Sequence, residues 1–321
     1  MLSGNLFSVL SDFDQFRTEN SPEGAMKVYR YWAKAGESVQ SDDFPWNVVC
    51  YGGSDISVEA ALAQATERAR AAAVAIREGH EPQLYAYSER PLREEIIREF
   101  EFDGDTAAII TRNAYGALVL NTANVAFADI DYPAQQYSSG QPQGCLAAIL
   151  GLFTGSFFES SQLSEEDRAD QDAVIVDRVR EMVSRLEGLG VRLYRTSNGF
   201  RVLVTSQTWD PVSLETTQLL EDFGSDPMYV TLCRSQQCFR ARLTPKPYRC
   251  EIENPPGRFP WPDDAAEQAF RLWEQKYQQE TEGYSTCMFI GAFGASDLDP
   301  EAELVVRLHD GIACAGEGPL A

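Results

Sequence analysis

Two aspartates at the end of an apolar run are the residues of this sequence best placed to do chemistry. Asp129 and Asp131 close the segment from Val125 to Ile130, and Pro133 ends it because proline cannot continue a central ladder. Strand positions two apart share one face, so both carboxylates point the same way. Adjacent carboxylates repel unless a cation or a shared proton lies between them. The pair predicts a site for Mg²⁺ or Mn²⁺ completed by a phosphate-bearing substrate, with a solvated strand end as the alternative.

A basic stretch without a single acid runs from Met228 to Cys250. Arginine forks match phosphate and carboxylate groups bidentately, so the stretch predicts a phosphate site that includes Arg240, Arg242 and Lys246. The first two share a face if residues 238–243 form a strand. The alternative is that these cations neutralise the protein's own carboxylates.

The segment from Val191 to Thr205 predicts a hairpin, because Asn198-Gly199 separates two β-rich runs. A two-residue turn at that position pairs Thr196 with Arg201. The two side chains would then share one face near the tip, where we expect both to contact phosphate.

The elements that must position these residues alternate strands and helices, with hairpins in the middle. This order predicts an α+β fold, with a mainly antiparallel sheet and flanking helices. Residues 1–44 are interpreted as an N-terminal arm, loose or with a short helix, before a single domain from 45 to 321. Helices are predicted at 58–76 after a Ser57 cap, 91–100, 165–186, 212–223 and 264–282. Strands are predicted at 45–51, 84–87, 106–111, 117–120, 125–130, 191–205 (the hairpin), 238–243, 286–290 and 304–308.

Bulk composition excludes several classes of protein. The net charge of −22 argues against nonspecific binding of DNA or RNA. The longest apolar stretch, Cys145 to Phe158, is too short to span a bilayer, and residues 1–10 carry no positive charge typical of a secretory signal. Seven scattered cysteines do not indicate a disulfide framework, and two histidines leave no readable hydrolase triad. We therefore expect a cytoplasmic protein with no membrane partner.

The order of these motifs resembles the catalytic core of the archaeo-eukaryotic primase superfamily, the primase-polymerases. Asp129-Ile130-Asp131 matches its Asp-hydrophobic-Asp, and Thr196-Ser197-Asn198-Gly199-Phe200-Arg201 matches its Thr-x-x-Gly-x-His, with Arg201 at the histidine position. The resemblance implies a primase-polymerase-like core, catalytic divalent metals on the two aspartates, and a phosphate contact from the hairpin. The family's third motif adds an aspartate on a later strand, where residues 238–243 carry arginines instead.

The runs TRNAYGALVLNTANVAFADIDYP and CFRARLTPKPYRC are also similar to a group of uncharacterised bacterial proteins, a similarity that brings no activity with it. Three functions stay open at this point. The first is a metal-dependent nucleotidyltransferase, with Asp129 and Asp131 as its catalytic and metal-binding residues. The second is a non-catalytic descendant that binds a nucleotide or a nucleic-acid strand end. The third is an acidic module that binds a protein partner.

Overall fold

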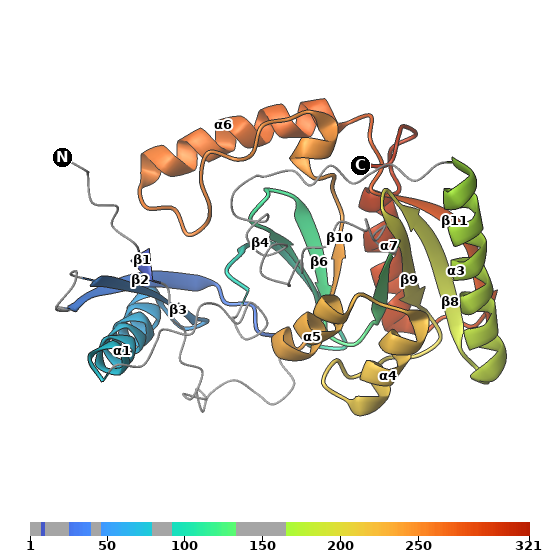
Figure 1. Ribbon diagram of the computed structural model, residues 1–321, viewed down its shortest axis with the longest axis horizontal. Helices are drawn as coiled ribbons and strands as arrows, with labels where there is room; N and C mark the ends of the chain where they lie inside the picture. The colour runs from blue at the N-terminus through green and yellow to red at the C-terminus, as the bar shows by residue number, and fades with distance from the viewer. Residues whose placement is uncertain (1–7, 10–25, 40–45, 79–91, 133–164) are drawn as a thin grey trace, which may run out of the picture.

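The computed structural model describes residues 8–9, 26–39, 46–78, 92–132 and 165–321. The fold is α+β, as the sequence predicts: helices flank three sheets whose strands pair mainly antiparallel (Figure 1). The strand orders of the sheets are β1-β3-β2, β10-β6-β5-β4 and β11-β8-β9-β7.

The first sheet and one helix form a small module at one end of the molecule, blue in Figure 1. Ser57 caps the helix by accepting the amide of Ala60, as predicted. The helix packs so closely on the sheet that a Cβ on Gly52 would lie 2.2 Å from the Ala61 carbonyl oxygen. Only glycine fits at that position. The elements are β1 (Ser8–Val9), β2 (Tyr31–Val39), β3 (Trp46–Ser54) and α1 (Val58–Arg77).

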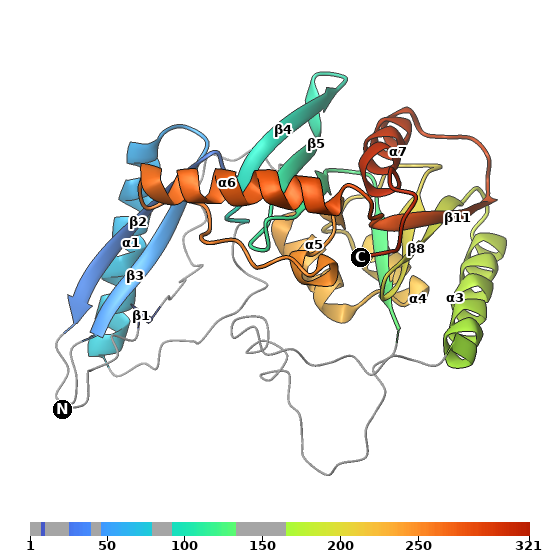
Figure 2. The same ribbon diagram turned by 90° about the horizontal axis from the view of Figure 1, so that it is seen from above.

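The second sheet lies in the middle, beneath a long helix. In both views α6 runs lengthwise over the module and this sheet (Figures 1 and 2). Arg271 pairs with Glu95 and Arg112 pairs with Glu274, which ties the helix to the sheet. The elements are β4 (Glu95–Phe102), β5 (Asp105–Arg112), β6 (Leu118–Thr122), β10 (Phe239–Arg242) and α6 (Asp264–Thr281).

The third sheet carries the carboxylate pair and is covered on both faces. One helix, α3, lies on its outer side, and another, α7, lies between it and the second sheet (Figures 1 and 2). Strand alternation directs Ile130 and Phe200 towards α3, and Asp129 and Arg201 towards α7. The elements are β7 (Phe127–Asp131), β8 (Gly190–Thr196), β9 (Gly199–Val204), β11 (Cys287–Gly294), α3 (Glu165–Arg185) and α7 (Pro300–Ala313).

Short helices join the second and third sheets. The Tyr229 hydroxyl donates 3.0 Å to the Phe127 carbonyl, and it also lies 3.1 Å from the Arg240 carbonyl. Because one hydroxyl carries one proton, it bridges β7 and β10 by sharing that proton between the two oxygens. The elements are α4 (Leu214–Phe223), α5 (Pro227–Gln236) and the 3₁₀ helix η2 (Pro247–Cys250).

Several predicted elements are wrong. Residues 95–100, expected as helix, belong to β4, and Asp103-Gly104 turns this strand into β5 with positive φ at both positions. Residues 304–308, expected as a strand, lie inside α7, which begins at an Asp299 cap with Pro300 in its first turn. Residues 31–39 of the expected arm form β2 rather than a helix or a loose segment.

The hairpin exists, but its predicted register is wrong. Thr196 pairs with Gly199, and Tyr194 pairs with Arg201, so the turn is Ser197-Asn198. The observed partner of Thr196 lies two positions from the predicted one. Residues two apart on a strand share a face, so Thr196 and Arg201 still lie on the same face, as predicted.

Some predictions fall outside the described residues: the strand at 84–87, the start of the helix at Pro91, and the apolar stretch Cys145 to Phe158. Within the described ranges, no helix is long and apolar enough to cross a membrane. The six described cysteines are free, and five of them are buried.

Candidate functional site

The carboxylate pair lies on the last residues of β7, and both side chains face α7. The Asp129 side chain is 38% exposed, and Asp131 is exposed at the strand end. Register places Asp129 opposite Arg201, and Asp131 opposite Gly199, next to the hairpin turn. The two acids therefore lie on one face of β7, as predicted.

Arg201 lies beneath the pair rather than beside it at the surface. Its side chain is 4% exposed, and its Nη2 lies 3.5 Å from Asp129 Oδ1. Its Nη1 donates to the Arg242 carbonyl at 2.8 Å. Such a buried guanidinium supplies positive charge to Asp129 but is poorly placed to reach a ligand in solvent.

A buried histidine on α7 helps to hold Arg201. His309 is 0% exposed, and its Nε2 lies 3.4 Å from Arg201 Nη1. A guanidinium only donates, so this nitrogen accepts and the proton resides on Nδ1, which lies 3.0 Å from Asp310 Oδ1. Burial, opposed by the bond to Asp310, lowers the pKa of His309, which keeps the ring neutral for this role.

Negative charge accumulates around Asp131. Loss of solvent raises the pKa of this carboxyl, and the charges of Asp129 and Asp226 raise it further. Opposing effects come from the amide of Asn198, which donates to Asp131 Oδ1 at 3.3 Å, and from the charge of Lys246. A cation bound between these carboxylates would relieve the repulsion.

Asp226 is a third acid at this place, and sequence reasoning missed it. It caps α5 by accepting the Tyr229 amide, while its own backbone amide donates 3.0 Å to the Asp129 carbonyl. The available signal was Asp226-Pro227, an acid followed by a first-turn proline, which is typical of a helix start. That signal locates a cap but says nothing of the strand beside it.

Three cations of the basic stretch, Arg242, Lys246 and Arg249, lie near the pair: the charge of Lys246 acts on Asp131, and that of Asp129 acts on Arg242. Burial, together with the charges of Arg249 and Arg201, lowers the pKa of Arg242 to about 10. Burial likewise lowers the pKa of Lys246, with Arg242 and Arg249 contributing. Arg249 donates to the hydroxyl of Ser197 in the hairpin turn. Arg242 Nη1 donates to the Thr244 carbonyl at 2.9 Å and to an oxygen of Ala321, the last residue of the chain, at 3.2 Å. Within the described part of the chain, Lys246 and Arg249 have no aspartate or glutamate oxygen within 4.0 Å.

Arg240, expected to bind phosphate, lies elsewhere. Its Nη2 is 2.8 Å from Oε1 of Glu94, which directly precedes β4, and its Nη1 donates to Asn121 of β6 at 2.9 Å. For this residue the neutralisation alternative describes the structure. Thr196 is half-buried on β8 opposite Gly199 and Cys287, on the same face as Arg201.

The donor chemistry of the pair fits a hard divalent cation. Carboxylate oxygens are the ligands Mg²⁺ and Mn²⁺ prefer, and Asp129 and Asp131 present them from one face. The contact from Arg201 to Asp129 is long, at 3.5 Å, so it leaves the carboxylate able to bind elsewhere.

A different group of ligand-type side chains lies on α7. In the described residues, His309, Asp310 and Cys314 are the one trio of His, Cys, Asp or Glu whose donor atoms all lie within 4.8 Å. Asp310 already accepts from Arg192 at 2.7 Å, and burial raises the pKa of Cys314 to about 12. Two members of the trio thus take part in hydrogen bonds within the protein, His309 with Arg201 and Asp310, and Asp310 with Arg192.

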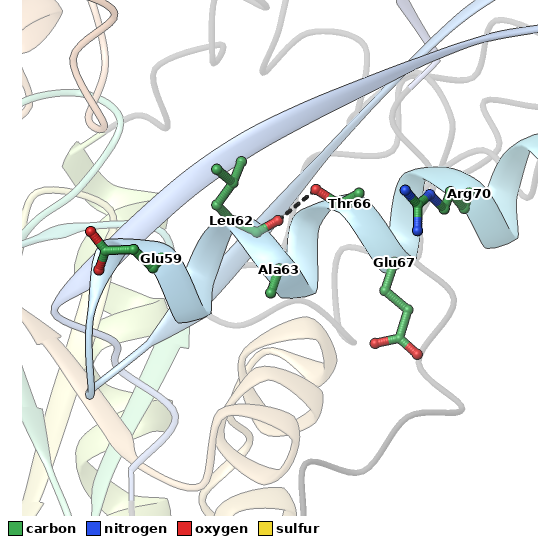
Figure 3. Close-up of a pocket in the computed structure, with 6 residues that line it drawn as sticks. All are labelled: Glu59, Leu62, Ala63, Thr66, Glu67 and Arg70. Carbon is green, nitrogen blue, oxygen red and sulfur yellow. Dashed lines mark hydrogen bonds between the residues drawn. The ribbon is translucent and has the colours of Figure 1, made fainter.

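A shallow pocket lies far from these residues, along the outer side of α1. Figure 3 shows its lining side chains, all from this one helix, with Thr66 donating 2.8 Å to the Leu62 carbonyl. It holds neither the carboxylates nor the cations of the third sheet. Its lining residues are Glu59, Leu62, Ala63, Thr66, Glu67 and Arg70.

The site can therefore be stated in chemical terms. Three acids, Asp129, Asp131 and Asp226, lie beside four cations, of which Arg201 is buried and the other three are half-buried. The resemblance to primase-polymerases stays a prediction. Comparison with models of protein families, with curated proteins and with solved structures finds no match for this chain.

Proposed function

We propose that this protein binds a phosphate-bearing nucleotide together with Mg²⁺ or Mn²⁺. Asp129 and Asp131 hold the metal, with Asp226 beside them, and Arg242, Lys246 and Arg249 contact the phosphate oxygens. A single observation carries the proposal: Lys246 and Arg249, which have no aspartate or glutamate within 4.0 Å in the described part of the chain, lie with Arg242 beside the carboxylates of Asp129 and Asp131.

The charge arrangement supports an anionic ligand over simple internal neutralisation. Elsewhere in the described ranges, arginines such as Arg240 and Arg112 pair directly with glutamates. At the site, the charge of Arg249 helps to lower the pKa of both Arg242 and Lys246, and the charge of Arg242 lowers that of Lys246 further, so the proximity of these cations costs free energy unless an anion lies between them. A polyphosphate would remove this repulsion and gain charge-assisted hydrogen bonds.

The metal supports the same ligand from the other side. A divalent cation bridges carboxylates to phosphate oxygens and neutralises charge that would otherwise repel the ligand. In this proposal Asp129 and Asp131 bind the metal, Arg201 supplies positive charge beneath Asp129, and Arg242, Lys246 and Arg249 bind the phosphates.

Nucleotidyl transfer is the finer proposal. Positioning and electrostatic stabilisation supply most of the rate in such transfers, and both follow from fixed carboxylates and cations. Asp226 supplies a further acid near the pair, although it stands at a helix cap and not on the strand where the primase motif has it. We place the protein in the cytoplasm, where its free thiols stay reduced.

The test measures binding of ATP with and without Mg²⁺ by calorimetry. Lys246→Ala/Arg249→Ala should weaken Mg²⁺-dependent binding by about 10-fold or more, since a hydrogen bond to a charged group contributes about 1.5–3 kcal/mol. Arg234→Ala is the matched control, because Arg234 belongs to the same basic stretch but is exposed on α5.

Equal affinity in the double variant and the control would refute the phosphate role of these cations. If wild type binds no phosphate ligand at millimolar concentration, the proposal fails entirely. If nucleotide binds but is not incorporated, the proposed binding site stands and the proposed nucleotidyl transfer is refuted.

A further inference from the structure

We infer that Tyr115 and Tyr248 form a base-stacking subsite beside the phosphate-binding cations, which makes the ligand a nucleotide with an exposed aromatic base rather than a plain polyphosphate. The inference rests on the proposed function, because it adds a second contact to the same site.

The two rings and the cations are interleaved. The ring centroids of Tyr115 and Tyr248 are 6.3 Å apart, with their planes at 69°. Lys246 Nζ lies 5.8 Å from each centroid, and Arg249 Cζ lies 6.0 Å from that of Tyr248. Groups that bind phosphate therefore alternate with surfaces that stack on a base, which is the combination used by proteins that bind single nucleotides or single strands.

Local structure fixes both rings before any ligand arrives. Asn113 accepts the amides of Tyr115 at 3.0 Å and Ala117 at 3.1 Å, which closes the turn that carries the first ring. Tyr248 lies in η2, directly after Pro247, which is buried. Both tyrosines are only half-buried, so each remains partly accessible to solvent. A pre-organised ring loses little conformational entropy when a base stacks on it.

The aromatic pair is continuous with the carboxylates through the hairpin turn. Arg249, next to Tyr248, donates to Ser197. The following residue, Asn198, donates to Asp131 at 3.3 Å. The order along the surface is rings, cations, turn and carboxylates. A nucleotide has the matching order of base, phosphates and bound metal.

Internal packing alone gives a weaker account of this cluster. A hydrogen bond with the Tyr248 side chain favours the charged form of Lys246, but in the described part of the chain no aspartate or glutamate lies within 4.0 Å to neutralise that charge. Besides burial, the charges of two further cations, Arg242 and Arg249, lower the pKa of Lys246. A ligand that carries both phosphate and an aromatic base would neutralise these cations and stack on the two rings.

The experiment compares Mg²⁺-ATP with Mg²⁺-tripolyphosphate, which carries the phosphates without a base. We expect wild type to bind ATP roughly 10-fold or more tightly than tripolyphosphate, the effect of stacking one base. Tyr248→Leu should remove this preference and leave tripolyphosphate binding unchanged, whereas Tyr248→Phe should keep it. Tyr31→Leu, at a 38% exposed tyrosine of the remote module, is the matched control.

The outcomes separate the two proposals. If neither ligand binds, the proposed function is refuted and the stacking subsite with it. If both bind with equal affinity in wild type and in Tyr248→Leu, the phosphate site stands and the stacking subsite is refuted. Tyr115→Leu repeats the comparison from the other ring, so that a folding defect in one variant, checked by thermal melting, does not decide the result.

Discussion

Gly199 offers the sharpest test of how the hairpin is fitted to the carboxylate strand. The glycine lies opposite Asp131, where a Cβ would lie 2.0 Å from the Ile130 carbonyl oxygen and 3.0 Å from Asp131 Cα. Its φ is +149°, which side chains of L-residues rarely adopt. Any substitution therefore meets both backbone strain and a clash with β7.

The size of the effect follows from these two terms. Relieving the clash requires β7 and β9 to separate by about 1.4 Å, the difference between 2.0 Å and ordinary contact at 3.4 Å. Overpacking of this kind costs about 1–3 kcal/mol, and backbone strain costs about 1–3 kcal/mol. Gly199→Ala should therefore lower the free energy of unfolding by roughly 2–6 kcal/mol.

Gly188→Ala is the matched control for the strain alone. Its φ is +79°, but nothing lies within 4 Å of its added Cβ. We expect it to cost about 1–2 kcal/mol in urea unfolding followed by circular dichroism. If the two variants lose the same free energy, the close approach to Ile130 is not real and the register at Asp131 must be rejected. Gly199→Ala, but not Gly188→Ala, should also weaken Mn²⁺ binding, because Asp131 moves.

Two further substitutions test the charges. The raised pKa of Asp131 gives a stability contribution that is complete below the carboxyl's unfolded pKa and is lost as pH rises through the higher folded pKa. Asp131→Asn should therefore raise the melting temperature at pH 7 and lose this advantage near pH 3, and added Mg²⁺ should raise the melting temperature of wild type only. Arg240→Leu leaves Glu94, 11% exposed, without its partner and should cost about 3 kcal/mol in urea unfolding, whereas Arg240→Leu/Glu94→Leu should recover most of that loss. A clear loss of Mg²⁺-ATP affinity in folded Arg240→Leu would contradict its placement outside the site.

Local patterns predicted the parts of the site that local structure builds. Strand alternation was enough to place Asp129 and Asp131 on one face, and the same rule placed Thr196 with Arg201. The turn was placed one residue late because Gly199 was interpreted as a turn glycine. The glycine is required by its approach to β7, a contact between segments 68 positions apart, from Asp131 to Gly199, which no local pattern records.

Some local signals were available and were outweighed. Asp103-Gly104 is a typical hairpin turn, yet a proline at position 91 favoured a helix through residues 95–100. Asp299-Pro300 is a typical helix start, yet the apolar run at 304–308 favoured a strand. In both cases a short apolar run fits either period, so the flanking turn or cap should decide.

The basic stretch shows why the partners of its arginines could not be predicted without long-range information. Arg240 and Arg242 are two positions apart on β10 and share a face, yet the first meets Glu94 and the second meets other cations. Sequence spacing therefore cannot distinguish the arginine that pairs with a glutamate from the arginine that lies among other cations. The difference lies in which strand each side chain reaches, since Arg240 extends across the second sheet and Arg242 lies where β10 approaches β9.

If the proposed function is right, the balance of charge also suggests how metal and nucleotide would bind together. Because Arg201 is buried against Asp129, the carboxylates are partly neutralised before any metal arrives, which weakens their hold on a divalent cation alone. Lys246 and Arg249 likewise have no aspartate or glutamate partner in the described part of the chain, and the proposed phosphate would supply one. Each ligand therefore removes the charge that opposes the other, and by linkage the metal must raise nucleotide affinity by the same factor as nucleotide raises metal affinity. We expect this protein to bind the metal–nucleotide pair far better than either component.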